Sequence, residues 1–234
     1  MVSRRHVLKS LPALMAVPAA ARLFGQAARP RIAVRSLSQM TLQVSDMARA
    51  LEFYQRLFGM PIQARQGSTV LLRIGAGPQF LALAPAGSAG PGFGHYGLAV
   101  ENFNADRLVS TLAEHGVTRA DPGAAGLSGG PMKVRVRPRG PEAGGAKEGT
   151  TEVFVGDPDG VVVQLQDPGY CGGAGAKGEV CATVVPSATP GLIAVKDISH
   201  FTIATTDPTR TNAFYKDLFG FGVHGGLQRV PRLE

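Results

Sequence analysis

The chain has 234 residues and a hydrophobic content of 44%, which is ordinary for a globular protein with a buried core. Its pI is about 9.8, and the excess positive charge lies in residues 1–45, which contain seven Lys or Arg and no acidic residue. From Asp46 onward, 17 basic and 17 acidic residues cancel. The globular part therefore has no net positive charge that would attract it to the phosphate backbone of a nucleic acid, and we expect no nucleic-acid partner.

The first 28 residues predict an export signal peptide. Arg4 and Arg5 precede a short apolar stretch, LPALMAVPAAARLFG, and then the small residues of GQAAR, which is the order of a secretory signal. The arginine pair resembles the twin-arginine export signal, which a receptor reads. The apolar stretch is too short to span a bilayer. We therefore expect cleavage near Ala28, no stable membrane anchor, and a periplasmic or secreted protein; a basic leader without export function is the alternative.

The first predicted elements have the order βαβββ. Alternating polar and apolar residues over 39–44 predict a half-buried strand. Asp46 suits a helix N-cap, apolar residues then recur at helical spacing, and Gly59 suits the end of that helix. Three strand-like runs follow, at residues 61–66, 69–74 and 79–84.

The same order returns after the turn-rich stretch PAGSAGPGFG, which predicts the fold class α+β with paired βαβββ modules at about 36–85 and 93–167. Residues 168–196 are rich in Gly, Pro, Ala and Thr and predict a linker. The elements of the second module are predicted at residues 95–100 (strand), 104–115 (helix), 132–137, 151–155 and 161–166 (strands), with Gly-rich loops at 121–131 and 140–149.

The opening phrase of the first module is repeated near the C-terminus. SQMTLQVSDMARALEFYQRLFGM begins at Ser38, and SHFTIATTDPTRTNAFYKDLFGF begins at Ser199, with 9 identities over 26 aligned positions. This spacing indicates a duplicated domain, so residues 197–234 predict the truncated start of a second one, with a strand and a helix. Such a pair is not stable alone. We expect it to pack on the first domain or on another chain, and a homodimer is one such arrangement.

Two cysteines, Cys171 and Cys181, lie ten residues apart in YCGGAGAKGEVC. An exported protein meets an oxidising compartment, which permits a disulfide between them. Two free thiols are the alternative. A metal site is the least favoured outcome, because no CxxC spacing or partner histidine accompanies them.

FYxxLFG after a strand and DPDG before a last strand, within paired βαβββ units, resemble the vicinal oxygen chelate superfamily, which includes glyoxalase I, extradiol dioxygenases and bleomycin-resistance-type proteins. The resemblance covers about residues 36–167 as one complete pair of units and 197–234 as the start of another. It implies a cup of sheet that holds a divalent metal, Fe(II), Mn(II), Ni(II) or Zn(II). A small oxygen-rich organic ligand would chelate that metal.

The resemblance also implies where metal ligands lie. The usual histidine of the first strand falls on Gln39, His95 matches a ligand histidine, and the usual glutamate of the last strand falls on Gln164. A position that is acidic in glyoxalase I falls near Ala82. Neutral amides bind dications weakly, so this set is either a weak metal site or a relic that hydrogen-bonds a ligand directly. His200 keeps the histidine that Gln39 replaces, but it lacks companions.

Strand alternation places further polar side chains on the faces of these candidate ligands. Thr41, Gln43 and Gln166 share those faces. The strand MKVRVRPRG carries Arg135 and Arg137 on one side, where they either line the cup and attract an anion or form a charged outer edge. Simple solvated sheet faces are the alternative for all of these residues.

These observations predict an exported glyoxalase/dioxygenase-superfamily protein of metal-dependent dioxygenase or lyase ancestry, whose first domain has a degenerate metal site. One alternative is a protein that binds a small molecule in the same cup without catalysis and without a cofactor. Another is an inactive fragment of a two-domain enzyme. The sequence contains no GxSxG, HExxH or glycine-rich phosphate loop, so hydrolase and nucleotide-binding functions have no support.

Overall fold

The computed structural model describes residues 32–222, so the predicted signal peptide and the last twelve residues of the second copy lie outside the described residues. Within residues 32–222 no helix is long and apolar enough to span a membrane. The elements are β1 (Val34–Val44), α1 (Met47–Phe58), β2 (Ile62–Gln66), β3 (Thr69–Arg73), β4 (Phe80–Pro85), β5 (Gly92–Val100), α2 (Ala105–Glu114), β6 (Thr118–Arg119), β7 (Lys133–Arg139), β8 (Thr150–Gly156), β9 (Val162–Gln166) and α3 (Pro208–Phe219), with short 3-10 turns at Gly87–Ala89 and Pro141–Ala143.

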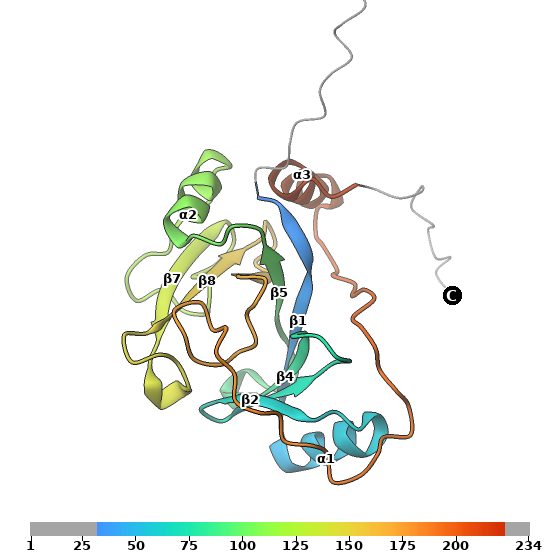
Figure 1. Ribbon diagram of the computed structural model, residues 1–234. Coiled ribbons are helices and arrows are strands. Elements are labelled where there is room, and N and C mark those ends of the chain that lie inside the picture. The colour runs from blue at the N-terminus through green and yellow to red at the C-terminus, as the bar shows by residue number, and fades with distance from the viewer. Residues whose placement is uncertain (1–31, 223–234) are drawn as a thin grey trace, which may run out of the picture.

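Two βαβββ modules form one continuous sheet with the strand order β2-β3-β4-β1-β5-β9-β8-β7-β6. The first strands of the modules, β1 and β5, pair antiparallel at its middle, and each also pairs in parallel with the last strand of its own module. The sheet is strongly curved, with α1 and α2 outside the curve (Figure 1). This architecture confirms the predicted α+β class and leaves the concave face free of helices.

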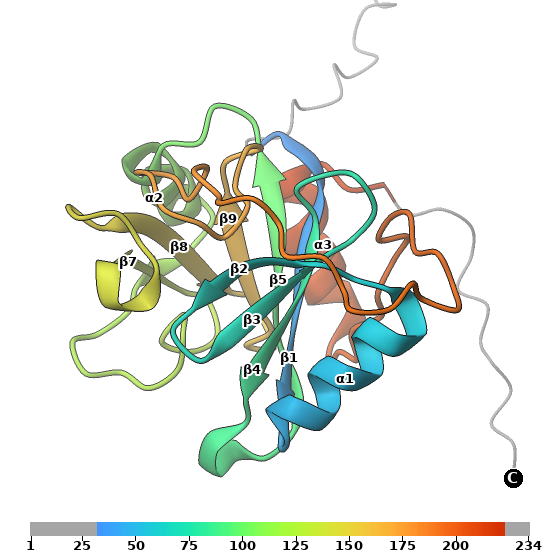
Figure 2. The ribbon, with the colours of Figure 1, turned by 60° about the horizontal axis from the view of Figure 1, so that its bottom comes forward.

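Helices α1 and α2 form where local signals predict them. The Asp46 side chain accepts a hydrogen bond from the Arg49 backbone N–H at 3.0 Å, and Gly59 ends α1 with a left-handed φ of 64°. Asn104 caps α2 by accepting from the Arg107 backbone N–H at 2.9 Å. Figure 2 shows α1 lying along the strands of the first module.

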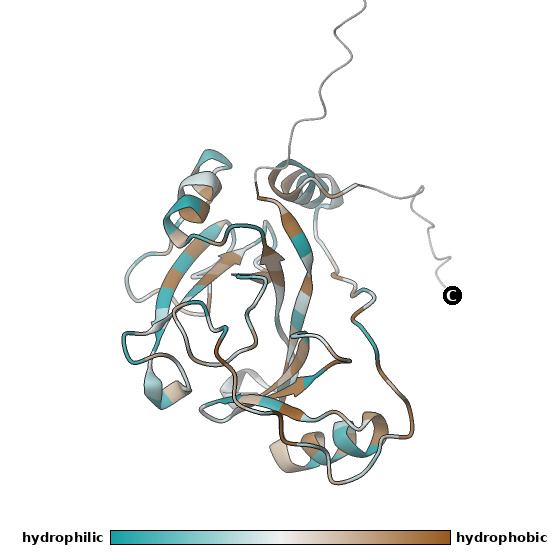
Figure 3. Cartoon of the chain, viewed as in Figure 1, coloured by the Kyte–Doolittle hydropathy of each residue, from teal (hydrophilic) through white to brown (hydrophobic). Residues whose placement is uncertain are grey.

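Buried apolar residues form clusters between the sheet and its helices, and Figure 3 shows hydrophobic and hydrophilic residues interspersed along the strands and helices. One cluster under α1 centres on buried residues such as Leu72 and Leu83, and the other, under α2 and α3, includes Leu98, Leu112 and Val153. Because successive strand residues alternate between faces, burial of these apolar residues on the outer face leaves the polar set on the concave face.

The second-copy segment packs on the first domain, with α3 on the outer face where β1 and β5 meet (Figure 1). Asp159 of the DPDG turn accepts hydrogen bonds from the hydroxyls of Thr206 and Thr211, and Leu218 is fully buried. The strand predicted for this copy is wrong, because residues 197–206 form no strand. The neighbouring strand β1 already has two partners, so this segment finds no open edge to pair with.

Residues 168–185, within the predicted linker, form what we call the strap, which crosses from the second module to the first (Figure 1). A disulfide joins Cys171 to Cys181. Gln63 Nε2 on β2 donates to the Cys171 carbonyl at 2.9 Å, and Arg139 Nη2 on β7 donates to the Gly173 carbonyl at 2.8 Å. Because β2 and β7 lie near opposite ends of the strand order, the strap joins the two ends of the curved sheet.

Candidate functional site

Three central strands bring the two candidate glutamines together. Gln39 on β1 lies opposite Gly97 on β5, and Gly97 lies opposite Gln164 on β9. The glutamine side chains meet above Gly97, where Gln39 Nε2 donates to Gln164 Oε1 at 2.6 Å. A Cβ on Gly97 would lie 2.6 Å from Gln39 Cγ. The absence of a side chain at this position therefore makes the contact sterically possible.

His95 completes what we call the amide–imidazole cluster, Gln39, His95 and Gln164. It lies two residues before Gly97 on β5 and so projects to the same face. Its Nε2 is 3.0 Å from Gln39 Nε2, 3.2 Å from Gln164 Oε1 and 3.3 Å from Thr41 Oγ1. With the ring proton on Nδ1, the Gln39 amide donates to both Gln164 and His95, and Thr41 also donates to Nε2.

The surroundings keep His95 uncharged. Burial lowers the pKa of His95 from 6.5 to about 4, and the positive charge of Arg137 acts in the same direction. The hydrogen bond that a protonated ring donates to Gln164 only partly opposes this lowering of the pKa. The amide–imidazole cluster is therefore neutral at pH 7.

The cluster lines a cavity of about 400 Å³ on the concave face. Thr41 and Gln43 line it beside the cluster, and Arg137 reaches it from β7. Ala82, near which the resemblance places the acidic position of glyoxalase I, also lies in its wall and offers only a methyl group. The remaining lining residues are Gln66, Thr69, Ala84, Gly94, Gly126, Leu127, Glu152, Phe154 and Val162.

Three residues with predicted site roles lie away from this cavity. Arg135 donates from Nη2 and Nη1 to backbone carbonyls of the 121–131 loop, at 2.5 and 2.6 Å. Gln166 is buried, and its Oε1 accepts from Ser38 Oγ at 2.7 Å. His200 is exposed on the segment before α3, where its Nδ1 lies 3.1 Å from the neighbouring Ser199 hydroxyl.

Sequence reasoning missed a buried carboxylate in the cavity wall. Glu152 on β8 is 2% exposed; its Oε1 accepts from Arg139 Nε at 2.9 Å and its Oε2 accepts from Arg137 Nε at 3.1 Å. Two guanidinium groups therefore offset its charge, as a buried carboxylate requires. Its signal in the sequence was the strand TEVFVG, where Glu152 alternates with Phe154 on the face opposite the valines.

Tyr170 was also missed, because it lies in the segment predicted as a linker. It is buried against Phe80, with ring centroids 6.1 Å apart, and its hydroxyl accepts from Gln66 Nε2 at 3.0 Å and donates to Glu152 Oε1 at 3.4 Å. Burial raises the pKa of Tyr170, which keeps the phenol neutral. The strap therefore supplies a polar group that lies behind the cavity wall and contacts Gln66 and Glu152, which line the cavity.

The donor set of the amide–imidazole cluster does not suit a divalent cation. It consists of two neutral amides and a neutral imidazole, and the Gln164 oxygen already accepts a 2.6 Å hydrogen bond. The carboxylate of Glu152 is held by two arginines. In the described part of the chain no group of three or more His, Cys, Asp or Glu is arranged to hold a metal ion. Divalent metals favour charged oxygen or sulfur donors, whereas this set suits a polar organic group.

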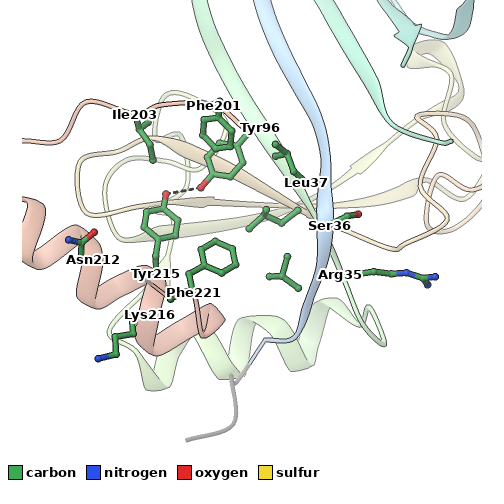
Figure 4. Close-up of a pocket in the computed structure, with 13 residues that line it drawn as sticks. Arg35, Ser36, Leu37, Tyr96, Phe201, Ile203, Asn212, Tyr215, Lys216 and Phe221 are labelled. Atoms are coloured by element: carbon green, nitrogen blue, oxygen red, sulfur yellow. Dashed lines mark hydrogen bonds between the residues drawn. The ribbon is translucent and has the colours of Figure 1, made fainter. Parts of the chain in front are cut away.

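A second cavity of about 540 Å³ lies on the outer face between β1, β5 and α3 (Figure 4). Aromatic side chains, including Tyr96, Phe201 and Tyr215, line it. The Tyr96 hydroxyl donates to Tyr215 at 2.7 Å, and Tyr215 donates to Asp157 at 3.0 Å, so both hydroxyls are occupied. Burial raises the pKa of both tyrosines. None of the predicted site residues lines this cavity.

Comparison with known proteins agrees with this architecture. Residues 36–165 match the family model described as the Glyoxalase/Bleomycin resistance protein/Dioxygenase superfamily. No curated protein matches the chain in sequence. Similar solved structures include BphC, a halotolerant catechol dioxygenase, with 17% identity, a TM-score of 0.51, and coverage of 81% of this chain and 56% of that one.

The Mn(II)-bound glyoxalase from Novosphingobium aromaticivorans is similar at 16% identity and a TM-score of 0.51, with 82% of this chain and 54% of that one covered. The chain thus spans just over half the length of these two structures, and identities this low concern the fold alone. The match over residues 36–165 exceeds half of the chain. The chain therefore belongs to the Glyoxalase/Bleomycin resistance protein/Dioxygenase superfamily.

Proposed function

We propose that this chain is an exported superfamily member with a degenerate metal site, whose cup binds a small organic ligand directly rather than through a resident metal. The observation that carries the proposal is the 2.6 Å hydrogen bond that the Gln39 amide donates to the Gln164 oxygen, beside the hydrogen bond that the same amide donates to His95. The 400 Å³ cavity beside them has room for a small organic molecule.

Direct binding agrees with the chemistry of the cavity wall. Amide, imidazole and hydroxyl groups converge there beside the apolar ring of Phe154, and a few convergent polar groups in an apolar concavity are typical of ligand sites. A metal-dependent dioxygenase or lyase is the second candidate. Its support is the Mn(II) bound by the similar glyoxalase structure and the imidazole of His95 in the cavity.

Metal analysis separates the two functions. The chain from Arg29 would be purified without chelators, its bound metals quantified, and Fe(II), Mn(II), Ni(II) and Zn(II) titrated by calorimetry, with His95→Ala as the matched variant. We expect less than a tenth of an equivalent of bound metal and no His95-dependent heat. Near-stoichiometric metal that is lost in His95→Ala would overturn direct binding and support the metalloenzyme.

Export is tested separately, because it depends on residues 1–28 and not on the cavity. A reporter fused behind these residues should reach the periplasm of a bacterium with a twin-arginine translocase. Replacing Arg4 and Arg5 by lysine should retain it in the cytoplasm, because the receptor reads the arginine pair. Equal export of both fusions would contradict the twin-arginine assignment.

A further inference from the structure

We propose that the ligand of the 400 Å³ cavity is a small organic monoanion whose anionic group pairs with Arg137 and whose other end contacts the amide–imidazole cluster. The inference rests on the proposed function and adds the charge class of the ligand. It also gives the direction in which the ligand lies.

The charges at the cavity leave one positive charge without a partner. Glu152 and Arg137 are the ionised side chains that line it among the described residues, and Arg139 lies behind Glu152 with its Nε 2.9 Å from the carboxylate. One carboxylate thus faces two guanidinium groups. The amide–imidazole cluster adds no charge, so the cavity favours a ligand with a single negative charge.

Arg137 differs from its strand neighbours in having free donors. Arg139 uses Nε, Nη1 and Nη2 in hydrogen bonds to Glu152 and two backbone carbonyls, and Arg135 uses both Nη atoms on the 121–131 loop. Arg137 donates only from Nε, to Glu152 Oε2, and neither of its Nη atoms hydrogen-bonds to another described residue. Its side chain is 45% exposed. Two parallel N–H donors are the arrangement that binds a carboxylate bidentately.

Phe154 sets the position of Arg137 relative to the cluster. The guanidinium carbon lies 4.7 Å from the centre of the Phe154 ring, and the His95 ring centroid lies 5.5 Å from the same ring, edge to face. The two polar groups therefore both contact one aromatic side chain, and their separation cannot exceed the sum of these distances. A ligand about the size of one substituted ring reaches both ends and packs on Phe154 between them.

The test compares benzoate with benzamide, which have the same shape but differ in charge. Each would be titrated into the full mature chain while NMR follows Arg137 Nε–H and the side-chain amides of Gln39 and Gln164. We expect benzoate to bind at least tenfold more tightly than benzamide, since a hydrogen bond to a charged group is the stronger one. Arg137→Gln should remove this preference, because benzoate loses a charged partner whereas benzamide loses only a hydrogen bond from its neutral carbonyl.

Arg137→Lys should keep part of the preference, because it keeps the charge but loses the bidentate geometry. Arg119→Gln, on the exposed edge strand β6, makes the same change in net charge outside the cavity and should have no effect. Equal affinity for both probes, or a benzoate preference that survives Arg137→Gln, would overturn the anion site while direct binding in the cup stands. Binding of neither probe, with no shift of the glutamine amides, would count against both proposals.

Discussion

Gln39 Nε2 on the first strand of the first module donates to Gln164 Oε1 on the last strand of the second module at 2.6 Å, although 125 positions separate them in the sequence. Family resemblance places a histidine and a glutamate at these two positions. With glutamine at both positions the side chains are still long enough to meet above Gly97, but the site lacks an anionic ligand that would offset the charge of a dication. The contact therefore joins the modules through a neutral hydrogen bond.

Restoring that charge should restore metal affinity. We expect Gln164→Glu to bind Zn(II) or Mn(II) at least tenfold more tightly than the unchanged chain, because a carboxylate beside His95 adds an anionic oxygen. Calorimetric titration measures this difference. The matched control is Gln43→Glu, which adds a carboxylate to the same cavity wall. Equal gains in both variants would show a general charge effect and contradict a metal-ligand geometry at Gln164.

Stability should depend on pH through His95. Its pKa is about 4 in the folded chain, below its ordinary value of 6.5, so folding disfavours the protonated ring. The contribution of the neutral His95 ring to stability is therefore fully present above pH 6.5, and the free energy of unfolding falls as the pH drops from 6.5 toward 4. The loss reaches about 3 kcal/mol, from 1.36 kcal/mol per pKa unit.

Urea unfolding at several pH values measures this loss, and NMR titration of the ring gives the folded pKa directly. His95→Gln keeps a polar side chain but does not titrate, so it should show a flatter stability profile between pH 6.5 and 4. An identical slope in both proteins would mean that other groups cause the acid sensitivity.

Gly97→Ala should separate the two glutamines. The new Cβ would lie 2.6 Å from Gln39 Cγ, 2.9 Å from Ser38 Oγ and 3.0 Å from Gln166 Cδ. Overpacking of this kind costs about 1–3 kcal/mol, and it should shift the amide resonances of Gln39 and Gln164. Gly67→Ala meets no atom within 4 Å but has a φ of 58°; it should lower stability by backbone strain and leave those resonances in place.

The packing of α3 on the first domain should contribute to global stability. Leu218 is fully buried in the outer-face cluster, so Leu218→Ala should lower the free energy of unfolding by about 2–5 kcal/mol in a single cooperative transition. Lys216→Ala changes an exposed side chain of the same helix and should cost under 1 kcal/mol. A separate early transition in Leu218→Ala would mean that α3 unfolds independently.

Loss of the disulfide should loosen the strap. Replacing Cys171 and Cys181 together by serine removes a cross-link that closes a loop of ten residues, with an expected cost of about 2–3 kcal/mol. Amide hydrogen exchange should rise in the strap before it rises in the central strands. A chemically reduced sample of the unchanged chain should match the variant, and exchange equal to the oxidised chain would contradict a structural role.

Local sequence determined α1, α2 and most strands. Asp46 begins α1 with a side-chain cap, and Gly59 ends it with a left-handed backbone conformation. Both signals depend only on neighbouring residues in the chain. Strand alternation likewise determined that Gln39, Thr41 and Gln43 share a face. The same pattern, repeated in the second copy, predicted a strand in residues 197–206, where the structure has none, because a strand also requires a neighbouring strand with an open edge.

Only the tertiary structure decided which polar groups meet. Gln39 and Gln164 come within 2.6 Å because β1 and β9 both pair with β5 at Gly97. Glu152 contacts two arginines because β7 pairs with β8. The position of Tyr170 depends on a strap whose composition resembles a linker. Sequence period decides the face on which a side chain lies, whereas pairing between distant strands decides its neighbours, and the chemistry of the cavity depends on those neighbours.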